Sequence, residues 1–478
     1  MFTENKGVFE MGYRIESDSI GSMEVPENAY YGVQSLRGAT NFKITGQKIN
    51  GELIISLAQL KKATAMSNME ARVLEKDKGE AIIKACDEII EGKLHDEFIV
   101  DEIQGGAGTS INMNANEVIA NRANEIMGGK KGTYDMVHPN DHVNMGQSTN
   151  DVIPSAGNIT TIKLIYRAIE SMNRLKDALL KKSEEFSEVI KMGRTQLQDA
   201  VPITLGQEFG AYAAAIKRDI NRMGKAIDAE RTVNMGGTAV GTGINADRAY
   251  EEKIVPNLTK VTGIEFKQSE DLIDGTQNLD KYVEVSSVIK TCAVNLSKIA
   301  NDLRLMSSGP RTGIGEINLP SKQNGSSIMP GKINPVIPEV INQIAFNVIG
   351  NDMTITMAAE AGQLELNAFE PVIFFNLFES IETLYRGVDT FVENCILGIT
   401  ANEDKCKEYV ERSVGIVTAL CPYIGYKESA RIAKKAIKTG MSVKEIILEE
   451  KLFKEEELET VLDAKAMLHP GIIGKKED

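Results

Sequence analysis

The amino-acid sequence predicts a mainly α-helical protein built around a bundle of long helices. Two stretches carry this prediction, because their apolar side chains recur every three or four residues and would form a buried stripe on a helix. The first stretch runs from Ile162 to Leu179, and the second, from Val285 to Met306, is nearly a heptad seam. With 478 residues, of which 42% are hydrophobic, the chain can bury the cores of two or three domains.

Further helices are expected before and between these stretches, over about 52–70, 79–91, 112–127 and 205–230. Strands and turns are expected in the segment that starts at Tyr13. The first bundle helix should end near Met192, and a polar turn, 193–202, should follow it. Thr204 and Gln207 then have the spacing of a capping box for the next helix.

The last part of the chain changes character. A helical region that reaches about residue 397 is broken near Gly362 and by Pro371, and short charged helices follow from about Thr400. We therefore expect three domains, an N-terminal one (1–142), a central helical bundle (143–397) and a small C-terminal one (398–478).

Composition excludes several classes of partner. The net charge is −14 and the basic residues are scattered, which argues against nucleic acid or an anionic membrane as a partner. The five cysteines are widely spaced and form no C-x-x-C pair, as expected for free thiols in the cytoplasm. No apolar run approaches the roughly 20 residues of a spanning helix, and the N-terminus has no signal-peptide core.

A long loop rich in glycine and proline, residues 308–335, carries the most specific chemistry. Its final part, Asn324 to Pro335, is here called the signature loop. Ser326 and Ser327 are followed by Lys332 and Asn334, and an apolar series at helical spacing begins directly after Pro335. Lys332 and Asn334 should therefore lie beside a helix N-terminus, where anions bind. An ordinary glycine-rich connector would have a similar composition.

The run GSSIMPGKINP closely resembles the signature of the aspartase/fumarase superfamily, whose members eliminate a group from a succinyl-type substrate and release fumarate. This resemblance implies that Ser326 is the catalytic base, and that Lys332 and Asn334 hold a substrate carboxylate. It extends over about residues 13–473. It also implies a three-domain fold whose central helices form the core of a homotetramer, with each active site shared among three subunits and no cofactor or metal.

Three other segments rich in glycine or hydroxyl groups, 105–110, 146–151 and 193–198, are each expected at or near a helix N-terminus. Taken singly, each could be an ordinary helix start. The resemblance implies that these segments and the signature loop come together in space and bind a dicarboxylate. The further residues that it places around the dicarboxylate substrate are Thr109, Ser148, Thr149, Asn150, Thr195 and Gln196.

Two other motifs are interpreted as structural. His138 and His142 are four residues apart, but Pro139 and the loop-forming residues after it argue against the helix that a shared metal would need. The same segment resembles a secondary anion site of fumarases. The loop 236–246 contains a G-x-G-x-x-A match, which we reject as a dinucleotide fingerprint because no strand is expected before it.

The leaving group is inferred from Gln196. Fumarases carry a histidine there that helps to activate water, whereas glutamine cannot transfer a proton near neutral pH. The runs GRTQLQDAVP and MAAEAGQLELN resemble those of aspartases. The resemblance therefore implies reversible deamination of L-aspartate to fumarate and ammonia by anti elimination, with the charge carried by an enediolate-type carboxylate. The alternatives are a fumarate hydratase and, less favoured, a non-catalytic structural relative.

Overall fold

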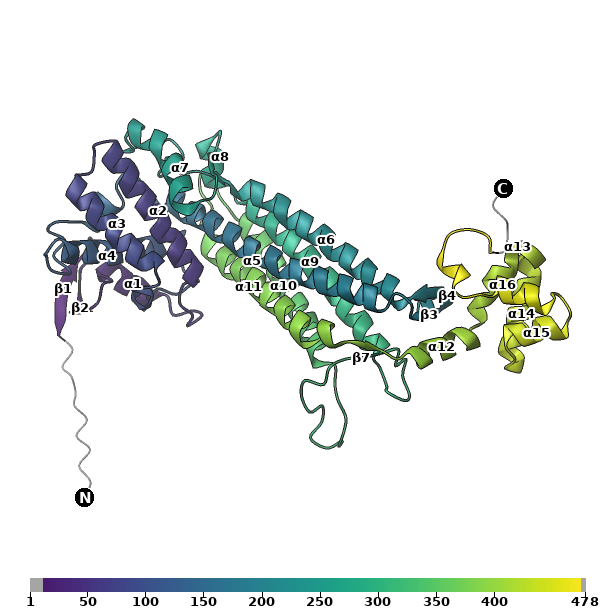
Figure 1. The fold of residues 1–478 in the computed structure, drawn as a ribbon. Coiled ribbons are helices and arrows are strands. Elements are labelled where there is room, and N and C mark those ends of the chain that lie inside the picture. Colours follow the sequence, from purple (N-terminus) through teal and green to yellow (C-terminus); the bar gives the residue numbers. More distant parts are fainter. Residues whose placement is uncertain (1–11, 474–478) are drawn as a thin grey trace, which may run out of the picture. The chain divides into compact units, whose positions relative to one another are not determined.

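The computed structural model describes residues 12–473 and is mostly helical, as the sequence predicts (Figure 1). The chain divides into two compact units. Unit 1 comprises residues up to Ile169, Arg222–Lys290 and Asn347–Thr383, and unit 2 comprises Glu170–Asn221, Thr291–Phe346 and the residues from Leu384 onward. This division follows packing within the chain. The three sequence-based domains, 1–142, 143–397 and 398–478, stay a prediction.

Unit 1 begins with an antiparallel hairpin of β1 (Tyr13–Ser17) and β2 (Ser22–Pro26), in agreement with the strands expected there. Its helices α2 (Gly51–Glu70), α3 (Lys76–Ile90) and α4 (Thr109–Ile126) lie within a few residues of the predicted bounds. The other α-helices and β-strands that lie wholly in unit 1 are α1 (Val33–Asn41), β5 (Thr232–Val233), α7 (Arg248–Thr262), β6 (Lys267–Gln268) and α8 (Leu272–Gln277).

Five long helices contribute residues to both units: α5 (Thr149–Glu185), α6 (Leu205–Glu230), α9 (Asp280–Met306), α10 (Val336–Glu360) and α11 (Glu370–Asn394). The predicted stripes are their buried faces, since Ile162, Leu179 and Val285 have no exposed surface. Gly157 of α5 lets the unit 1 part of the bundle pack closely, because a Cβ there would lie 2.2 Å from the ring of Phe374.

Unit 2 also contains two small sheets, β3 (Ile190–Thr195) with β4 (Gln198–Thr204) and β7 (Ile317–Asn318) with β8 (Thr400–Ala401). After these come the short helices α12 (Glu403–Arg412), α13 (Cys421–Ile424), α14 (Tyr426–Thr439), α15 (Val443–Glu449) and α16 (Glu455–Val461). The short charged helices predicted after residue 400 are thus confirmed. Leu420, Ile432, Ile446 and Leu458 are fully buried in a core of their own.

Two local predictions about the chain at the end of α5 were wrong. Helix α5 ends at Glu185 rather than near Met192, and residues 190–204 form a hairpin instead of a polar turn before a helix. The hairpin forms because β3 pairs with β4 and buries Lys191 and Met192.

The predicted capping box is confirmed, since Gln207 N donates to Thr204 Oγ1 at 2.9 Å and Thr204 N donates to Gln207 Oε1 at 3.0 Å.

The segment after His138 is helical, contrary to the prediction. Residues Pro139–Val143 form one π-helical turn, in which Asn144 N donates to Pro139 O at 3.0 Å. Proline at the first helical position costs no hydrogen bond, and His138 Nδ1 accepts from Asn140 N at 3.3 Å, which caps the turn.

The loop 236–246 follows a short strand, β5, that the sequence analysis did not expect. This strand has only two residues and pairs in parallel with β6. The N–H groups of Gly236 and Thr238 bind the carboxylate of Asp151, so this loop has a structural use inside unit 1.

Candidate active site

The starts of α4 and α5 lie side by side in unit 1. Thr109 is the first residue of α4 and Thr149 the first residue of α5. Asn112 Nδ2 donates to Thr149 Oγ1 at 3.2 Å, and a Cβ on Gly108 would lie 3.0 Å from the side chain of Ile153. Two helix N-termini therefore present their N–H groups at one place, which favours negative charge.

A buried carboxylate holds the start of α5. Asp151 Oδ1 accepts from Ser148 N at 2.9 Å, and Asp151 Oδ2 accepts from Gly236 N at 3.3 Å and from Thr238 N at 3.1 Å. Asn150 Nδ2 donates to Ala239 O at 2.7 Å. The loop 236–239 thus fixes the backbone of the segment that carries three of the predicted substrate-binding residues. Burial raises the pKa of Asp151 to about 6, although the backbone N–H donors oppose this shift.

A buried lysine lies behind the same segment. Lys61 Nζ donates to Asn144 Oδ1 and to Gln147 Oε1, both at 2.9 Å. Burial lowers the pKa of Lys61 to about 7, while the charge of Asp151 opposes the shift. Two buried titratable groups, a carboxyl and an amine, therefore support the residues that precede and start α5.

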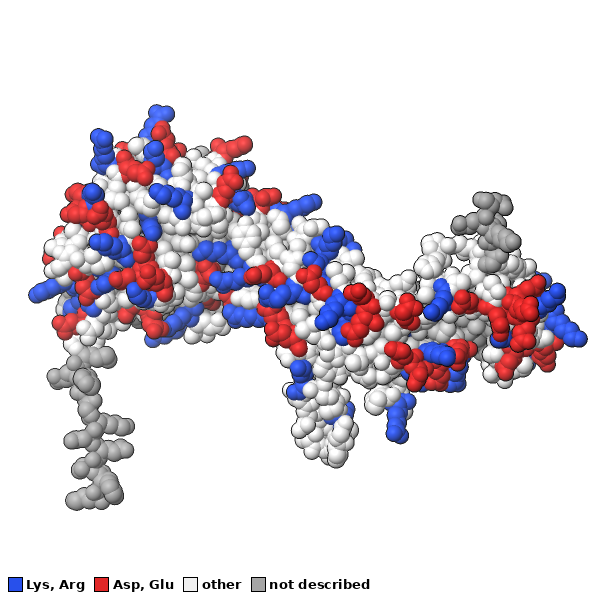
Figure 2. All heavy atoms as spheres, viewed as in Figure 1, with Lys and Arg blue, Asp and Glu red and all other residues white. Residues whose placement is uncertain are grey.

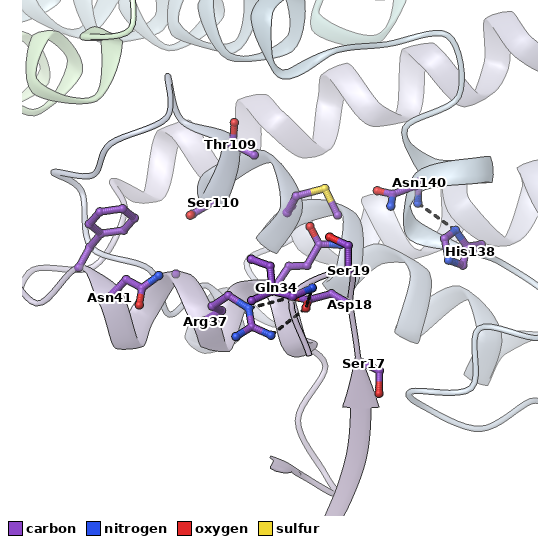
Figure 3. A pocket seen from close by; sticks show the side chains of 14 residues that line it. Ser17, Asp18, Ser19, Gln34, Arg37, Asn41, Thr109, Ser110, His138 and Asn140 are labelled. Carbon is purple, nitrogen blue, oxygen red and sulfur yellow. Dashed lines mark hydrogen bonds and ion pairs between the residues drawn. The ribbon is translucent and has the colours of Figure 1, made fainter. Parts of the chain in front are cut away.

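Unit 1 contains a pocket of about 470 Å³ that Thr109 and Ser110 line together with His138 and Asn140; these side chains are labelled in Figure 3. Arg37 on its wall is paired to Asp18, with Arg37 Nε 2.9 Å from Asp18 Oδ2. The Arg37 guanidinium lowers the pKa of Asp18. Thr109 Oγ1 donates to Gly106 O at 2.7 Å and remains exposed.

Thr195 and Gln196 lie at the tip of the β3–β4 hairpin in unit 2. Thr195 pairs with Gln198, so the connection is a two-residue turn of Gln196 and Leu197. Both have positive φ, 55° and 61°, which is unusual for residues other than glycine. The strained turn exposes both side chains to solvent.

The signature loop in unit 2 is closed on itself. Gly325 N donates to Lys332 O at 3.0 Å, and Asn334 Nδ2 donates to Gly325 O at 2.7 Å. A Cβ at position 325 would lie 2.5 Å from Lys332 O, so the closure requires glycine there. Helix α10 begins two residues after Asn334, which confirms the predicted position of Lys332 and Asn334 near a helix start.

Ser326 has two donors aimed at its hydroxyl. Its Oγ accepts from Ile328 N at 3.2 Å and from Met329 N at 2.9 Å. Hydrogen bonds to an oxygen that can become negative stabilise the charged form. The loop around it is open, since Ile328 is 84% exposed and Met329 is 49% exposed.

The predicted site residues thus fall into two groups. Unit 1 brings together the residues at the starts of α4 and α5: Thr109, Ser148, Thr149 and Asn150. In unit 2, Ser326, Lys332 and Asn334 share one closed loop, while Thr195 and Gln196 lie on a hairpin. The fourth predicted helix start, at 193–198, was therefore wrong. Among residues 12–473 no group of three or more His, Cys, Asp or Glu side chains could hold a metal.

The sequence analysis missed Lys61, Asn112 and Asp151, which position predicted site residues. The available signal for Lys61 was its place on the apolar side of the predicted helix 52–70, four residues after Leu57 and next to Leu60. Asp151 is the last residue of the predicted segment 146–151, but two of its partners come from the loop 236–238, which no local pattern connects to it.

Comparison with known proteins gives consistent matches along the chain. Residues 21–350 match the family described as Lyase, and residues 416–469 match the one described as Fumarase C C-terminus. An aspartate ammonia-lyase from a Bacillus species is 55% identical over 97% of this chain and 99% of its own length. Proteins of the same name from Bacillus subtilis and Helicobacter pylori (strain 26695) are 54% and 52% identical, over 97% of this chain and 98% and 100% of theirs.

Solved structures agree with the observed fold. The crystal structure described as fumarate lyase:delta crystallin from Brucella melitensis bound to cobalt has a TM-score of 0.93 and 48% identity, covering 96% of this chain and 100% of that one. A class II fumarase from Schistosoma mansoni has the same TM-score, 0.93, with 35% identity, covering 96% of this chain and 99% of that one. The chain therefore belongs to the aspartase/fumarase superfamily of lyases, the family that includes the aspartate ammonia-lyases.

Proposed function

We propose that this chain catalyses the reversible deamination of L-aspartate to fumarate and ammonia. The observation that carries this proposal is the similarity to aspartate ammonia-lyases, at 52–55% identity over 97% of the chain. The reaction breaks the bond from the β-carbon to hydrogen and the bond from the α-carbon to nitrogen on opposite faces. One proton goes to a base and ammonia leaves.

Ser326 is proposed as the base. A serine hydroxyl removes a carbon-bound proton only in its alkoxide form. In water-like surroundings this form is rare, because the hydroxyl keeps its own proton. Two N–H groups pointing at Ser326 Oγ, from Ile328 and Met329, support this role because they stabilise an alkoxide. The exposure of these same two residues means that another surface must cover the loop before the site becomes dry.

Lys332 and Asn334 are proposed to hold the carboxylate next to the carbon that loses its proton. That carboxylate gains charge as the enediolate-type intermediate forms, so a fixed cation and fixed donors contribute the largest electrostatic stabilisation. The proximity of both residues to the start of α10 supports this assignment.

Thr109, Ser148, Thr149 and Asn150 are proposed to bind the other carboxylate and the amino group. Their place at the starts of α4 and α5 supplies donors without a second cation. Thr195 and Gln196 complete the pocket. Gln196 has no proton to transfer near neutral pH, which suits departure of ammonia better than addition of water.

We also propose the oligomeric state and the compartment. The homotetramer is supported by large apolar side chains that α10 leaves exposed, among them Phe346 at 65% in unit 2 and Met353 at 64% in unit 1. Each active site would combine segments from three copies of the chain.

The described residues include no helix long and apolar enough to cross a membrane, and acidic and basic groups are interspersed on the face drawn in Figure 2. We place the enzyme in the cytoplasm.

Fumarate hydratase is the second candidate, favoured by the 35% identity to a class II fumarase. The two are separated by following fumarate in the ultraviolet with purified protein given L-aspartate or L-malate, with Ser326→Ala as the blank. Fumarate from L-aspartate alone is expected. Fumarate from L-malate alone would replace this proposal by the hydratase, and no product from either would favour the structural alternative.

A further inference from the structure

A fully buried carboxylate, Glu316, lies in unit 2 between the hairpin and the chain that leads to the signature loop. Its side chain has no exposed surface. Arg194 Nη1 donates to Glu316 Oε1 at 2.6 Å, and Lys191 Nζ lies 2.9 Å from Glu316 Oε2. Both cations belong to β3, and Arg194 directly precedes Thr195.

The charges in this cluster are balanced. Lys191 Nζ also donates to Glu208 Oε2 at 2.7 Å, so two cations face two carboxylates. Burial lowers the pKa of Lys191, but the two carboxylates outweigh it, and the net shift is upward. Lys191 is therefore charged at neutral pH, and loss of Glu316 would leave the buried Lys191 and the partly buried Arg194 with Glu208 as the one carboxylate of the cluster.

Backbone contacts hold Glu316 itself in place. Glu316 N donates to Met306 O at 2.9 Å at the end of α9, and Asn402 N donates to Glu316 O at 2.8 Å. Asn402 Nδ2 donates to the neighbouring carbonyl of Gly315 at 2.8 Å. The next two residues, Ile317 and Asn318, pair with β8. Glu316 is thus a rigid point eight residues before the signature loop begins.

A second path leads from Arg194 to the same place. The Arg194 guanidinium lies 5.4 Å from the centre of the Tyr409 ring, and Tyr409 Oη donates to Ile314 O at 2.9 Å. Arg194 is therefore held by a carboxylate and by an aromatic face that both connect to residues 314–316.

From this geometry we infer that Glu316 is a positioning residue, which through Arg194 and Lys191 sets the hairpin tip, with Thr195 and Gln196, relative to the chain entering the signature loop. The inference rests on the proposed function in one respect, that Thr195 contacts the substrate. The tip is a strained two-residue turn with exposed side chains, so the fixed base of the hairpin decides where these side chains point.

The test is a double-mutant cycle of Glu316→Gln and Thr195→Ala, with kcat and KM measured separately. Glu316→Gln keeps the shape but turns an amide nitrogen or a neutral oxygen toward the cations. It is expected to lower kcat/KM about 100-fold, as a small displacement of substrate-positioning groups does. In the Thr195→Ala background the same change should cost only about 10-fold, because one of the two tip side chains that Glu316 positions is already gone.

Asp219→Asn is the matched control. Asp219 is a buried carboxylate of unit 2 whose oxygens accept from Asn295 Nδ2 at 3.0 and 2.9 Å. This variant should change kcat and KM less than about 3-fold, as expected for a buried polar group away from the hairpin. If Glu316→Gln does not fold, Glu316→Asp, which retains the charge on a shorter side chain, replaces it in the cycle.

Three outcomes would overturn the inference: equal costs of the Glu316 variant in both backgrounds, unchanged kcat and KM in the folded fraction, or an equal loss in Asp219→Asn. The cycle uses whichever of L-aspartate and L-malate the unmodified protein converts. A wrong choice of substrate under the proposed function therefore appears in the unmodified protein, and a wrong role for Glu316 appears only in the cycle.

Discussion

The two groups of site residues are held in opposite ways. In unit 1, Ser148, Thr149 and Asn150 start a long helix, are half-buried, and are supported by the buried side chains of Asp151 and Lys61. In unit 2, the signature loop has Ile328 on its surface at 84% exposure and is held chiefly by hydrogen bonds among its own residues.

This difference suggests a division of labour. Groups that bind a carboxylate unchanged through the reaction benefit from a rigid, pre-formed arrangement. A serine base needs a dry site, and a site that stays dry cannot admit substrate, so the loop that carries it has to open and close. The predictions below test each side of this comparison, from the largest expected effect to the smallest.

Ser326→Ala should lower kcat about 1,000-fold or more, because it removes the base while leaving the helix-start donors in place. Binding of succinate, a dicarboxylate without a leaving group, should change little. Steady-state rates and inhibition by succinate measure the two effects. Ser327→Ala is the matched control, since its exposed hydroxyl lies next in the chain. Near-normal turnover of Ser326→Ala would exclude this serine as the base.

Lys332→Ala should lower kcat/KM about 100-fold and weaken succinate binding at the same time, because a cation on the carboxylate acts in the ground state and in the transition state. Lys322→Ala, which removes another exposed lysine of the same long loop, should have little effect. An unchanged KM for L-aspartate and an unchanged succinate constant in Lys332→Ala would contradict a carboxylate contact.

Asp151→Asn should lower kcat/KM about 10-fold, because the amide nitrogen faces backbone N–H donors that the carboxylate accepted. In the unmodified protein activity should fall as the pH drops through about 6, where the buried carboxyl of Asp151 takes up a proton. The variant should lack this acid limb.

For Asp151, the free energy of unfolding is expected to change with pH in the opposite direction to the activity. The pKa of Asp151 is raised above its ordinary value of 3.8, so the native state binds more protons, and the free energy of unfolding falls as the pH rises from about 4 to about 6.

Asp247→Asn is the control for the activity measurement, since Asp247 caps α7 by accepting from Ala249 N at 2.8 Å. Acid limbs of equal position in both variants would show that Asp151 is not the titrating group.

Leu197→Asn should give the smallest effect. Leu197 has a φ of 61° and is 68% exposed, so little apolar burial is lost and a residue that tolerates this conformation replaces one that does not. We expect a gain of about 0.5–1 kcal/mol, seen as a rise of about 1–2 °C in Tm. A fall in Tm would mean that the Leu197 side chain is buried in the assembled protein.

The sequence predicted the helices well because their apolar periodicity is local. The bounds of α2 and α9 and the start of α10 agree with it to within a few residues. The hairpin was not predicted because its turn residues, Gln196 and Leu197, are neither glycine nor asparagine, the residues that usually mark such a turn. The π-helical turn was not predicted because proline usually interrupts a helix, whereas Pro139 stands at the first helical position, where proline is compatible with a helix.

The site was predicted in part for a similar reason. Motifs identified the residues proposed to touch substrate, and the structure places Ser326, Lys332 and Asn334 in one closed loop. The residues that support them pair across long separations, as Lys61 does with Asn144 and Arg194 with Glu316. Such pairs depend on the tertiary fold, and no local spacing in the sequence reveals them.

The central claim is that the two groups of residues meet in an active site shared by different copies of the chain. Subunit complementation tests it most directly. Asn150→Ala and Ser326→Ala are each expected to be nearly inactive, and co-refolding them should regain a substantial part of the activity, because some sites in mixed tetramers combine only intact segments. A mixture no more active than the two variants alone would contradict the claim.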